Sequence, residues 1–231
     1  MLTLLAPIVF IEKYVYNIIN NNERVLMNRV ELKTRAKEVI KGNVFSFFLI
    51  IFLPMLVFAI TGATGWGSLV SVVLGGAVSY AMAVIFLKGI RKGGAPKIED
   101  LLLGFKDNNF GRTLEAYIRY IVFIFLWTLL FIVPGFIKML SYSQMFYILA
   151  DNKGMSAGEA QKKSMEMMNG HKMDLFVLYL SFIPWLLFVM ITFGFGIIYV
   201  GPYMELTLAA FHDKIAGKGA KAPEAKAVAA K

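Results

Sequence analysis

Two long stretches without a charged residue constrain this chain more than any other feature. They are Val44–Thr61 and Trp66–Leu87, of 18 and 22 residues. An α-helix rises about 1.5 Å per residue, so about 20 mainly apolar residues cross the roughly 30 Å of hydrocarbon in a bilayer. The linker at 62–65 is short and contains two glycines. We therefore predict two membrane-spanning helices that form an antiparallel hairpin.

Two later apolar regions are interrupted near their middle. The first, 117–150, is broken by Pro134-Gly135, and the second, 175–211, by Gly194-Phe195-Gly196. Each region is compatible with one long kinked helix or with a hairpin of two shorter helices. A helix of about 15 residues spans only about 22 Å. In the hairpin arrangement, the fourth and sixth helices would therefore stop short of a full crossing or thin the bilayer.

The positions of the basic residues favour the hairpins. Of 24 lysines and arginines, 22 lie in four blocks, which are 24–41, 88–119, 153–172 and 214–231. Cytoplasmic loops carry the excess of Lys and Arg, and placing all four blocks inside requires an even number of crossings between them. We predict an all-α protein of the cell membrane, with six transmembrane or near-transmembrane helices in three hairpins and both termini cytoplasmic. A four-helix arrangement with the third block outside is the alternative.

A polar, amphipathic stretch precedes each predicted hairpin. In the first, 32–40, apolar residues follow a helical spacing, and in the second they recur at 98, 101, 102 and 105. The third begins with Ser156 and Glu159 at the spacing of a capping box, followed by a narrow apolar stripe through Met168. We expect a cytoplasmic amphipathic helix before each hairpin. The threefold pattern fits either a triplicated module or topology alone.

The two ends of the chain differ from the rest in composition. Residues 1–26 are either an interfacial helix or an over-long start, because a charged helix opens at Met27. Residues 27–215 form a single integral-membrane domain in this interpretation. Residues 216–231 are rich in Ala, Lys and Gly without an apolar stripe, which predicts a disordered basic tail.

Several short motifs together resemble one bacterial family, the integral-membrane domain-of-unknown-function family numbered 975. The motifs are Glu31-Leu-Lys-Thr-Arg-Ala-Lys37, Lys41-Gly-Asn43, Trp127-Thr-Leu-Leu-Phe-Ile-Val-Pro-Gly-Phe-Ile-Lys138, Tyr142-Ser-Gln-Met-Phe-Tyr-Ile-Leu-Ala-Asp151, Asn169-Gly-His-Lys172, Leu180-Ser-Phe-Ile-Pro-Trp185, Gly201-Pro-Tyr203 and Ala210-Phe211. The resemblance covers about residues 27–215 and departs from the family pattern at Phe211-His212, where members usually carry Phe-Tyr. It implies a multipass membrane protein and no established activity.

The residue types available limit the chemistry of the chain. There is no cysteine, and the two histidines lie 41 positions apart, which leaves no thiolate metal site and little material for a metal centre. No nucleophile, base and metal set converges in this sequence. We therefore predict no catalytic residue, no metal and no cofactor, and a protein that is not an enzyme.

In a soluble protein, a net charge of +9 would favour binding to nucleic acid, but 58% of the residues of this chain are hydrophobic. Beside a bilayer the same charge favours anionic lipid head groups, and we predict no nucleic-acid partner. The predicted anionic-lipid contacts are Arg35, Lys37, Lys41, Arg91 and Lys92.

Two further sets of residues stand out inside the predicted membrane helices. Ser71, Gly75, Ser79 and Ala83 recur every four residues, which predicts a small-residue stripe for helix packing. Glu205 is the one acidic residue well inside a predicted membrane segment, and Lys138 is its natural partner at a similar depth. We predict an intramembrane polar pair between Lys138 and Glu205.

Two functions remain open at this point. The first is a non-enzymatic membrane protein that binds lipid, a hydrophobic peptide or a protein partner, or that forms a homo-oligomer. The alternative is a small oligomeric transporter or channel, against which the scarcity of intramembrane ionisable groups counts.

Overall fold

All regular elements in the part of the chain that the structure describes are helices. This computed structural model describes residues 29–62, 67–106, 109–130 and 132–218. The first helix covers 29–40. The others are α2 (Val44–Gly62), α3 (Gly67–Lys92), the 3₁₀ helix η1 (Ile98–Gly104), α4 (Asn109–Leu130), α5 (Ile132–Tyr142), α6 (Met145–Asp151), α7 (Ala157–Met167), α8 (Lys172–Leu180), α9 (Ile183–Ile191) and α10 (Ile197–Ile215). The predicted all-α class is confirmed.

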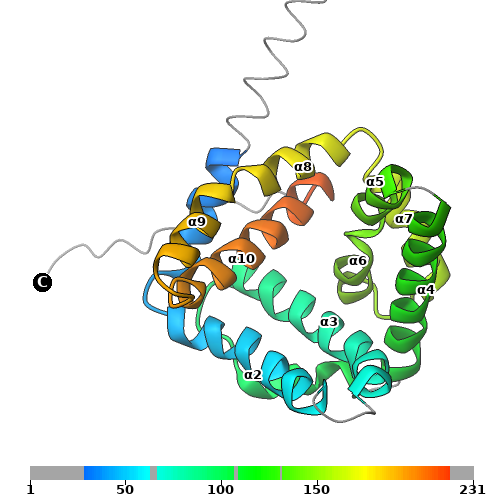
Figure 1. The fold of residues 1–231 in the computed structure, drawn as a ribbon, viewed down its shortest axis with the longest axis horizontal. Coiled ribbons are helices and arrows are strands. Elements are labelled where there is room, and N and C mark those ends of the chain that lie inside the picture. The colour runs from blue at the N-terminus through cyan, green and yellow to red at the C-terminus, as the bar shows by residue number, and fades with distance from the viewer. Residues whose placement is uncertain (1–28, 63–66, 107–108, 131, 219–231) are drawn as a thin grey trace, which may run out of the picture.

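Helix α3 lies at the centre of the helical bundle. It packs against α2, η1, α4, α6 and α10 (Figure 1). Half of its apolar span is buried inside the protein, against 17% for the span of α2. Close packing is possible because α3 is rich in small residues. A side chain at Gly76 would collide with the backbone of Thr113 on α4, and one at Gly75 would collide with the Tyr117 ring.

Within the residues that the structure describes, three helical segments are long and apolar enough to cross a membrane. They are Val44–Gly62, Val70–Lys92 and Lys172–Ile191, the last made of α8 and α9 together. The region expected to give the fourth helix is divided into α5 and α6 by a turn at Ser143-Gln144. The short linker of the first predicted hairpin, 63–66, and residue 131 lie outside the described residues.

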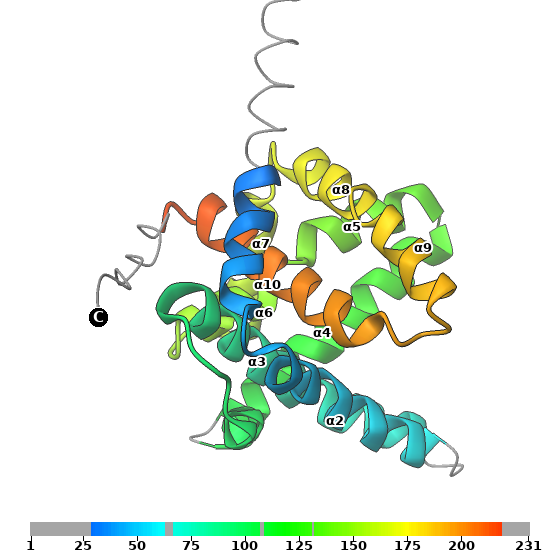
Figure 2. The same cartoon turned by 90° about the vertical axis from the view of Figure 1, so that its left-hand side faces the viewer.

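Much of the outer surface is apolar. Helix α2 buries only three residues, all in its first eleven positions, and Figure 2 shows it extending along the lower edge of the molecule. Between α9 and α10, the side chain of Phe193 is 95% exposed and that of Phe195 is 76% exposed. Exposed apolar side chains in such numbers are typical of a surface in contact with lipid or another protein.

The three predicted amphipathic stretches form different kinds of helix. The first forms the helix 29–40, and its apolar residues Leu32, Ala36, Val39 and Ile40 are all buried. The second forms the 3₁₀ helix η1 with Ile98 and Leu102 exposed. The third forms α7.

The N-terminus of α7 is the predicted capping box. The backbone N–H of Glu159 donates to the Ser156 hydroxyl, and the Glu159 carboxylate accepts from the Ser156 backbone at 2.9 Å. Hydrogen bonding to this exposed carboxylate lowers the pKa of Glu159. The apolar stripe expected on α7 is buried as far as Met168.

The predicted terminal segments fall mainly where nothing is described. All of 1–26 lies outside the described residues, as does the basic tail from 219 onward. Of the tail interval, only 216–218 is described, and it directly follows α10.

Candidate functional site

A buried group of charges joins the ends of three helices. Arg91, in the last turn of α3, lies between Asp151 at the end of α6 and Asp213 near the end of α10. Its guanidinium donates to both oxygens of Asp151, at 2.5 and 2.9 Å. It also donates to Asp213 Oδ1, from Nη2 at 2.6 Å and from Nε at 2.9 Å. The Asp213 side chain is fully buried, so this arginine is the counter-ion that makes its burial possible.

Two more side chains complete what we call the Arg91 cluster: Arg91, Asp151, His212, Asp213 and Lys218. The Lys218 ammonium donates to Asp151 Oδ2 at 2.8 Å, and His212 Nε2 lies 3.2 Å from the same oxygen. Burial acts to raise the pKa of Asp151, but hydrogen bonds from His212, Arg91 and Lys218 outweigh it and hold that pKa well below its usual range. No group of His, Asp and Glu in the described residues is arranged to hold a metal ion.

His212 extends the cluster toward the interior. Its Nδ1 lies 3.1 Å from Gln144 Oε1, in the turn between α5 and α6. Its ring stacks on Tyr147 with 5.2 Å between ring centroids. The side chain is 1% exposed, so His212 supplies a buried hydrogen-bonding link between α10 and α6.

A separate cavity of about 300 Å³ lies where α2 begins and α3 ends; we call it the lysine groove. Three lysines line it, Lys88 and Lys92 from the last turns of α3 and Lys97 from the following loop. Phe47 and Ile85 supply an apolar floor. Asp100 forms an ion pair with Lys88 at 3.2 Å. Among the described residues, neither Lys92 nor Lys97 has an ion-pair partner, so the groove carries an excess of positive charge.

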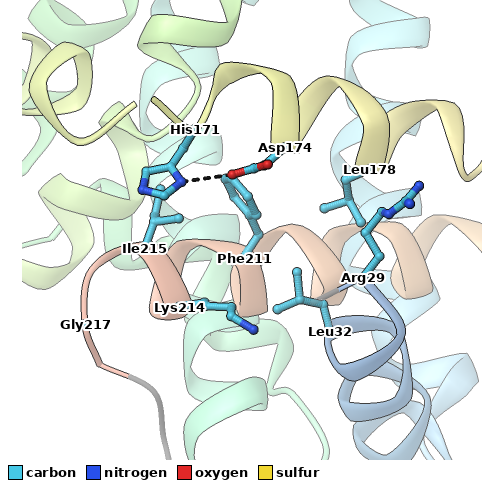
Figure 3. Close-up of a pocket in the computed structure, with 9 residues that line it drawn as sticks. All are labelled: Arg29, Leu32, His171, Asp174, Leu178, Phe211, Lys214, Ile215 and Gly217. Carbon is cyan, nitrogen blue, oxygen red and sulfur yellow. Dashed lines mark hydrogen bonds and ion pairs between the residues drawn. The ribbon is translucent and has the colours of Figure 1, made fainter. Parts of the chain in front are cut away.

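Figure 3 shows a second cavity, of about 310 Å³, between the first helix, α8 and the end of α10. Leu32, Leu178 and Phe211 give it an apolar wall. His171 Nδ1 lies 3.0 Å from Asp174 Oδ2, and Lys214 donates to Glu31 at 2.7 Å.

The five predicted lipid contacts occupy different environments. Lys92 lines the lysine groove, and Lys41 is exposed after the first helix. Arg35 donates to the Ile90 carbonyl at 3.0 Å, and the Lys37 ammonium lies 5.7 Å from the centre of the Trp185 ring. The guanidinium of Arg91 is held by two carboxylates. Lys88 and Lys97, which the sequence placed in the same basic block without singling them out, complete the groove.

The small-residue stripe on α3 is divided between two neighbours. Gly75 lies against Tyr117 of α4, in line with the expected close approach. Ser79 and Ala83 line a different cavity, which faces α6, α8 and α10. Ser71 lies nearer the start of α3 and is partly buried.

The structure does not bring Lys138 and Glu205 together. The Lys138 ammonium lies 4.8 Å from the centre of the Trp127 ring, between α5 and α4. Glu205 lines the cavity that Ser79 and Ala83 also line. No ion pair joins the two residues in the described part of the chain. A similar depth in the membrane does not determine which faces of two helices meet, so it does not place Lys138 beside Glu205.

The Arg91 cluster was missed because each of its acidic members has an adequate local explanation. Asp151 precedes Asn-Lys-Gly and suggests a turn, while His212-Asp213 suggests an ordinary helix end. The usable signal is that Asp151, Asp213 and Arg91 all lie at the polar ends of apolar segments. Such ends meet when the segments pack side by side.

The comparisons with known proteins identify a family. The model of the DUF975 family, described as a protein of unknown function, matches residues 27–141 and 132–219. Together these matches cover most of the chain, which therefore belongs to that family. A comparison with curated proteins and one with solved structures found no match.

Proposed function

We propose that this member of the DUF975 family is a non-enzymatic, multipass protein of the cell membrane whose cytoplasmic face binds anionic lipid head groups. The observation that carries the proposal is the lysine groove, where α2 begins and α3 ends, which combines an apolar floor with two lysines that have no ion-pair partner among the described residues. A partner protein, a hydrophobic peptide or a second copy would use the exposed apolar surface instead, and these are the other forms that binding could take.

The chemistry of an anionic phospholipid fits this groove. Lys92 and Lys97 lie beside the end of an apolar span, where a lipid phosphate would lie, and the buried side chains of Phe47 and Ile85 make the adjoining wall apolar. Each juxtamembrane basic residue contributes about 1 kcal/mol near an anionic surface. Two unpaired lysines therefore give a clear preference for anionic over zwitterionic lipid.

A lipid titration tests the proposal. The purified protein in mild detergent is titrated with short-chain phosphatidylglycerol and, separately, with short-chain phosphatidylcholine. We expect tighter binding of phosphatidylglycerol and a loss of about 30-fold in the double variant Lys92→Gln/Lys97→Gln, from two contributions of about 1 kcal/mol. The matched control is Lys162→Gln/Lys163→Gln on α7, which removes the same charge elsewhere. An equal loss in both double variants would reject the groove as the site.

The membrane arrangement that we propose has six crossings or near-crossings in three hairpins, with both termini cytoplasmic. It is supported by the four basic blocks and by the three apolar spans. Single cysteines introduced at Lys97 and Lys162 should be protected from an impermeant thiol reagent in intact cells, and a cysteine at Phe195 should react. Labelling at position 162 would favour four crossings with the third basic block outside.

A small oligomeric transporter or channel is the second candidate. The observation in its favour is the cavity lined by Glu205, because acidic groups inside a membrane protein commonly mark a substrate or ion path. Solute flux in proteoliposomes that is abolished in Glu205→Gln would support this candidate. Unchanged flux in that variant would remove the reason for it.

A further inference from the structure

The cavity lined by Glu205 has a composition unlike that of the lysine groove. It lies between α3, the α5–α6 turn, α8 and α10, and its volume is about 230 Å³. This is below the roughly 300–1,000 Å³ of sites for drug-sized ligands. An occupant would therefore be a group of only a few heavy atoms.

One acidic side chain faces aromatic and polar neighbours in this cavity. Glu205 comes from α10, and within the described part of the chain its carboxylate has no hydrogen-bond or ion-pair partner. Tyr147 and Tyr179 line the same cavity and lie close enough to interact electrostatically with Glu205. Phe146 adds a third aromatic ring, and Ser79 and Gln144 add polar atoms. Among the described residues, no lysine or arginine lines the cavity.

This combination favours one class of ligand. An unpaired carboxylate in such a place is costly and is stabilised by a cation. A hard metal ion such as Ca²⁺ requires six to eight oxygen ligands, and Mg²⁺ requires near-octahedral oxygen coordination, whereas much of this lining is aromatic. Aromatic faces attract an organic ammonium through cation–π interactions, as in the cages that bind choline and methylated lysine. A carboxylate beside several rings is therefore better matched to an alkylammonium group than to a metal ion.

We propose that the cavity between α3, α6, α8 and α10 binds a small organic ammonium group, with Glu205 as its counter-ion and Tyr147, Tyr179 and Phe146 as its aromatic wall. The group belongs either to a free amine or to an amine-bearing lipid head group. This site is separate from the lysine groove and takes the opposite charge. The proposal therefore stands or falls independently of anionic-lipid binding.

Binding of choline to the purified full-length protein in detergent tests this site. The neutral comparison compound is 3,3-dimethyl-1-butanol, which has the shape of choline without its charge. We expect choline to bind and the alcohol to bind at least about tenfold more weakly. In Glu205→Gln we expect choline affinity to fall by about 10- to 100-fold, because an ionic contact is lost. The control Glu166→Gln, which changes an exposed acid on α7, should leave affinity unchanged.

A second variant guards against a folding defect in Glu205→Gln. Tyr179→Leu keeps the carboxylate and removes one aromatic face, so choline affinity should fall by a few-fold to about tenfold while helix content by circular dichroism stays the same. Equal binding of choline and the alcohol would overturn the proposal. So would undiminished choline binding in a folded Glu205→Gln protein.

A further experiment in two different lipids decides whether the ammonium group comes from a lipid or from a free amine. The protein is reconstituted in nanodiscs of phosphatidylethanolamine or of phosphatidylglycerol, and choline affinity is measured again. Weaker choline binding in phosphatidylethanolamine, with the difference lost in Glu205→Gln, assigns the site to a lipid head group. Equal affinity in both lipids, with the Glu205 dependence retained, assigns it to a free amine.

Discussion

Arg91 and Lys92 are adjacent in the sequence, belong to the same basic block and have different surroundings. Arg91 is held between Asp151 and Asp213 inside the protein, whereas Lys92 lines the lysine groove. Helical geometry explains the difference, because neighbouring side chains point about 100° apart while residues four apart share a face. Lys88 and Lys92 therefore face the groove together. A count of basic residues near a membrane thus overstates the charge available to lipid, since part of it neutralises buried carboxylates.

The largest expected effect separates these two neighbours by stability. Arg91→Met leaves two carboxylates without their arginine, and breaking a buried ion pair costs about 3–5 kcal/mol. We expect the lower part of that range because the Arg91 side chain is 29% exposed. Lys92→Met should change stability by less than about 0.5 kcal/mol. Unfolding in mild detergent measures the stability of both variants. Similar losses of stability in Arg91→Met and Lys92→Met would remove the distinction between the Arg91 cluster and the lysine groove.

A double variant sharpens the assignment of Arg91 to the cluster. Arg91→Met alone leaves two carboxylates without their arginine, whereas Arg91→Met combined with Asp213→Asn leaves only the Asp151 carboxylate without it. The losses for Arg91→Met and Asp213→Asn should therefore be non-additive by about 0.5–3 kcal/mol, with the double variant less damaged than their sum. Strict additivity in the same unfolding assay would mean that the two side chains do not act together.

Acid should weaken the cluster. The pKa of Asp151 is lowered from 3.8 in the folded protein. A carboxyl with a lowered folded pKa contributes stability that is present above its ordinary pKa and is lost as the pH falls toward the folded value. We expect the unfolding midpoint to fall as the pH drops below about 4, and to fall less steeply in Asp151→Asn. Parallel pH profiles for the two proteins would contradict this role of Asp151.

The sequence predicts those parts of the fold whose causes are local. The runs that became α2 and α3, the capping box of α7 and the buried face of the first helix all follow from apolar spacing or from residues three or four apart. The turn at Ser143-Gln144 and the 3₁₀ geometry of η1 do not follow in this way. Both lie within stretches whose apolar pattern is compatible with a continuous helix, and tertiary packing decides between the two.

The candidate site follows the same division. Lys92 was predicted as a lipid contact from its basic block, and the structure places it in the lysine groove. Its contact with lipid stays a prediction. The role of Arg91 depends on residues 60 and 122 positions away, and a local pattern cannot indicate such contacts. Glu205 was correctly recognised as unusual, but its surroundings come from four separate helices, so the sequence suggested Lys138 instead of the aromatic cavity.

We propose that Lys92 and Lys97 bind lipid and that Arg91 stabilises the folded protein. The unfolding midpoint, measured with and without phosphatidylglycerol, tests this division most directly. A ligand that binds only the folded state raises stability by about 1.4 kcal/mol at tenfold its Kd. Lys92→Gln/Lys97→Gln should unfold like the parent without lipid and lose most of the lipid-induced rise. Arg91→Lys keeps the positive charge but loses the bidentate contact with the carboxylates. This variant should have a lower unfolding midpoint without lipid and should retain the lipid-induced rise in that midpoint. A full lipid-induced rise in the midpoint of Lys92→Gln/Lys97→Gln, or the loss of that rise in Arg91→Lys, would contradict this division of roles.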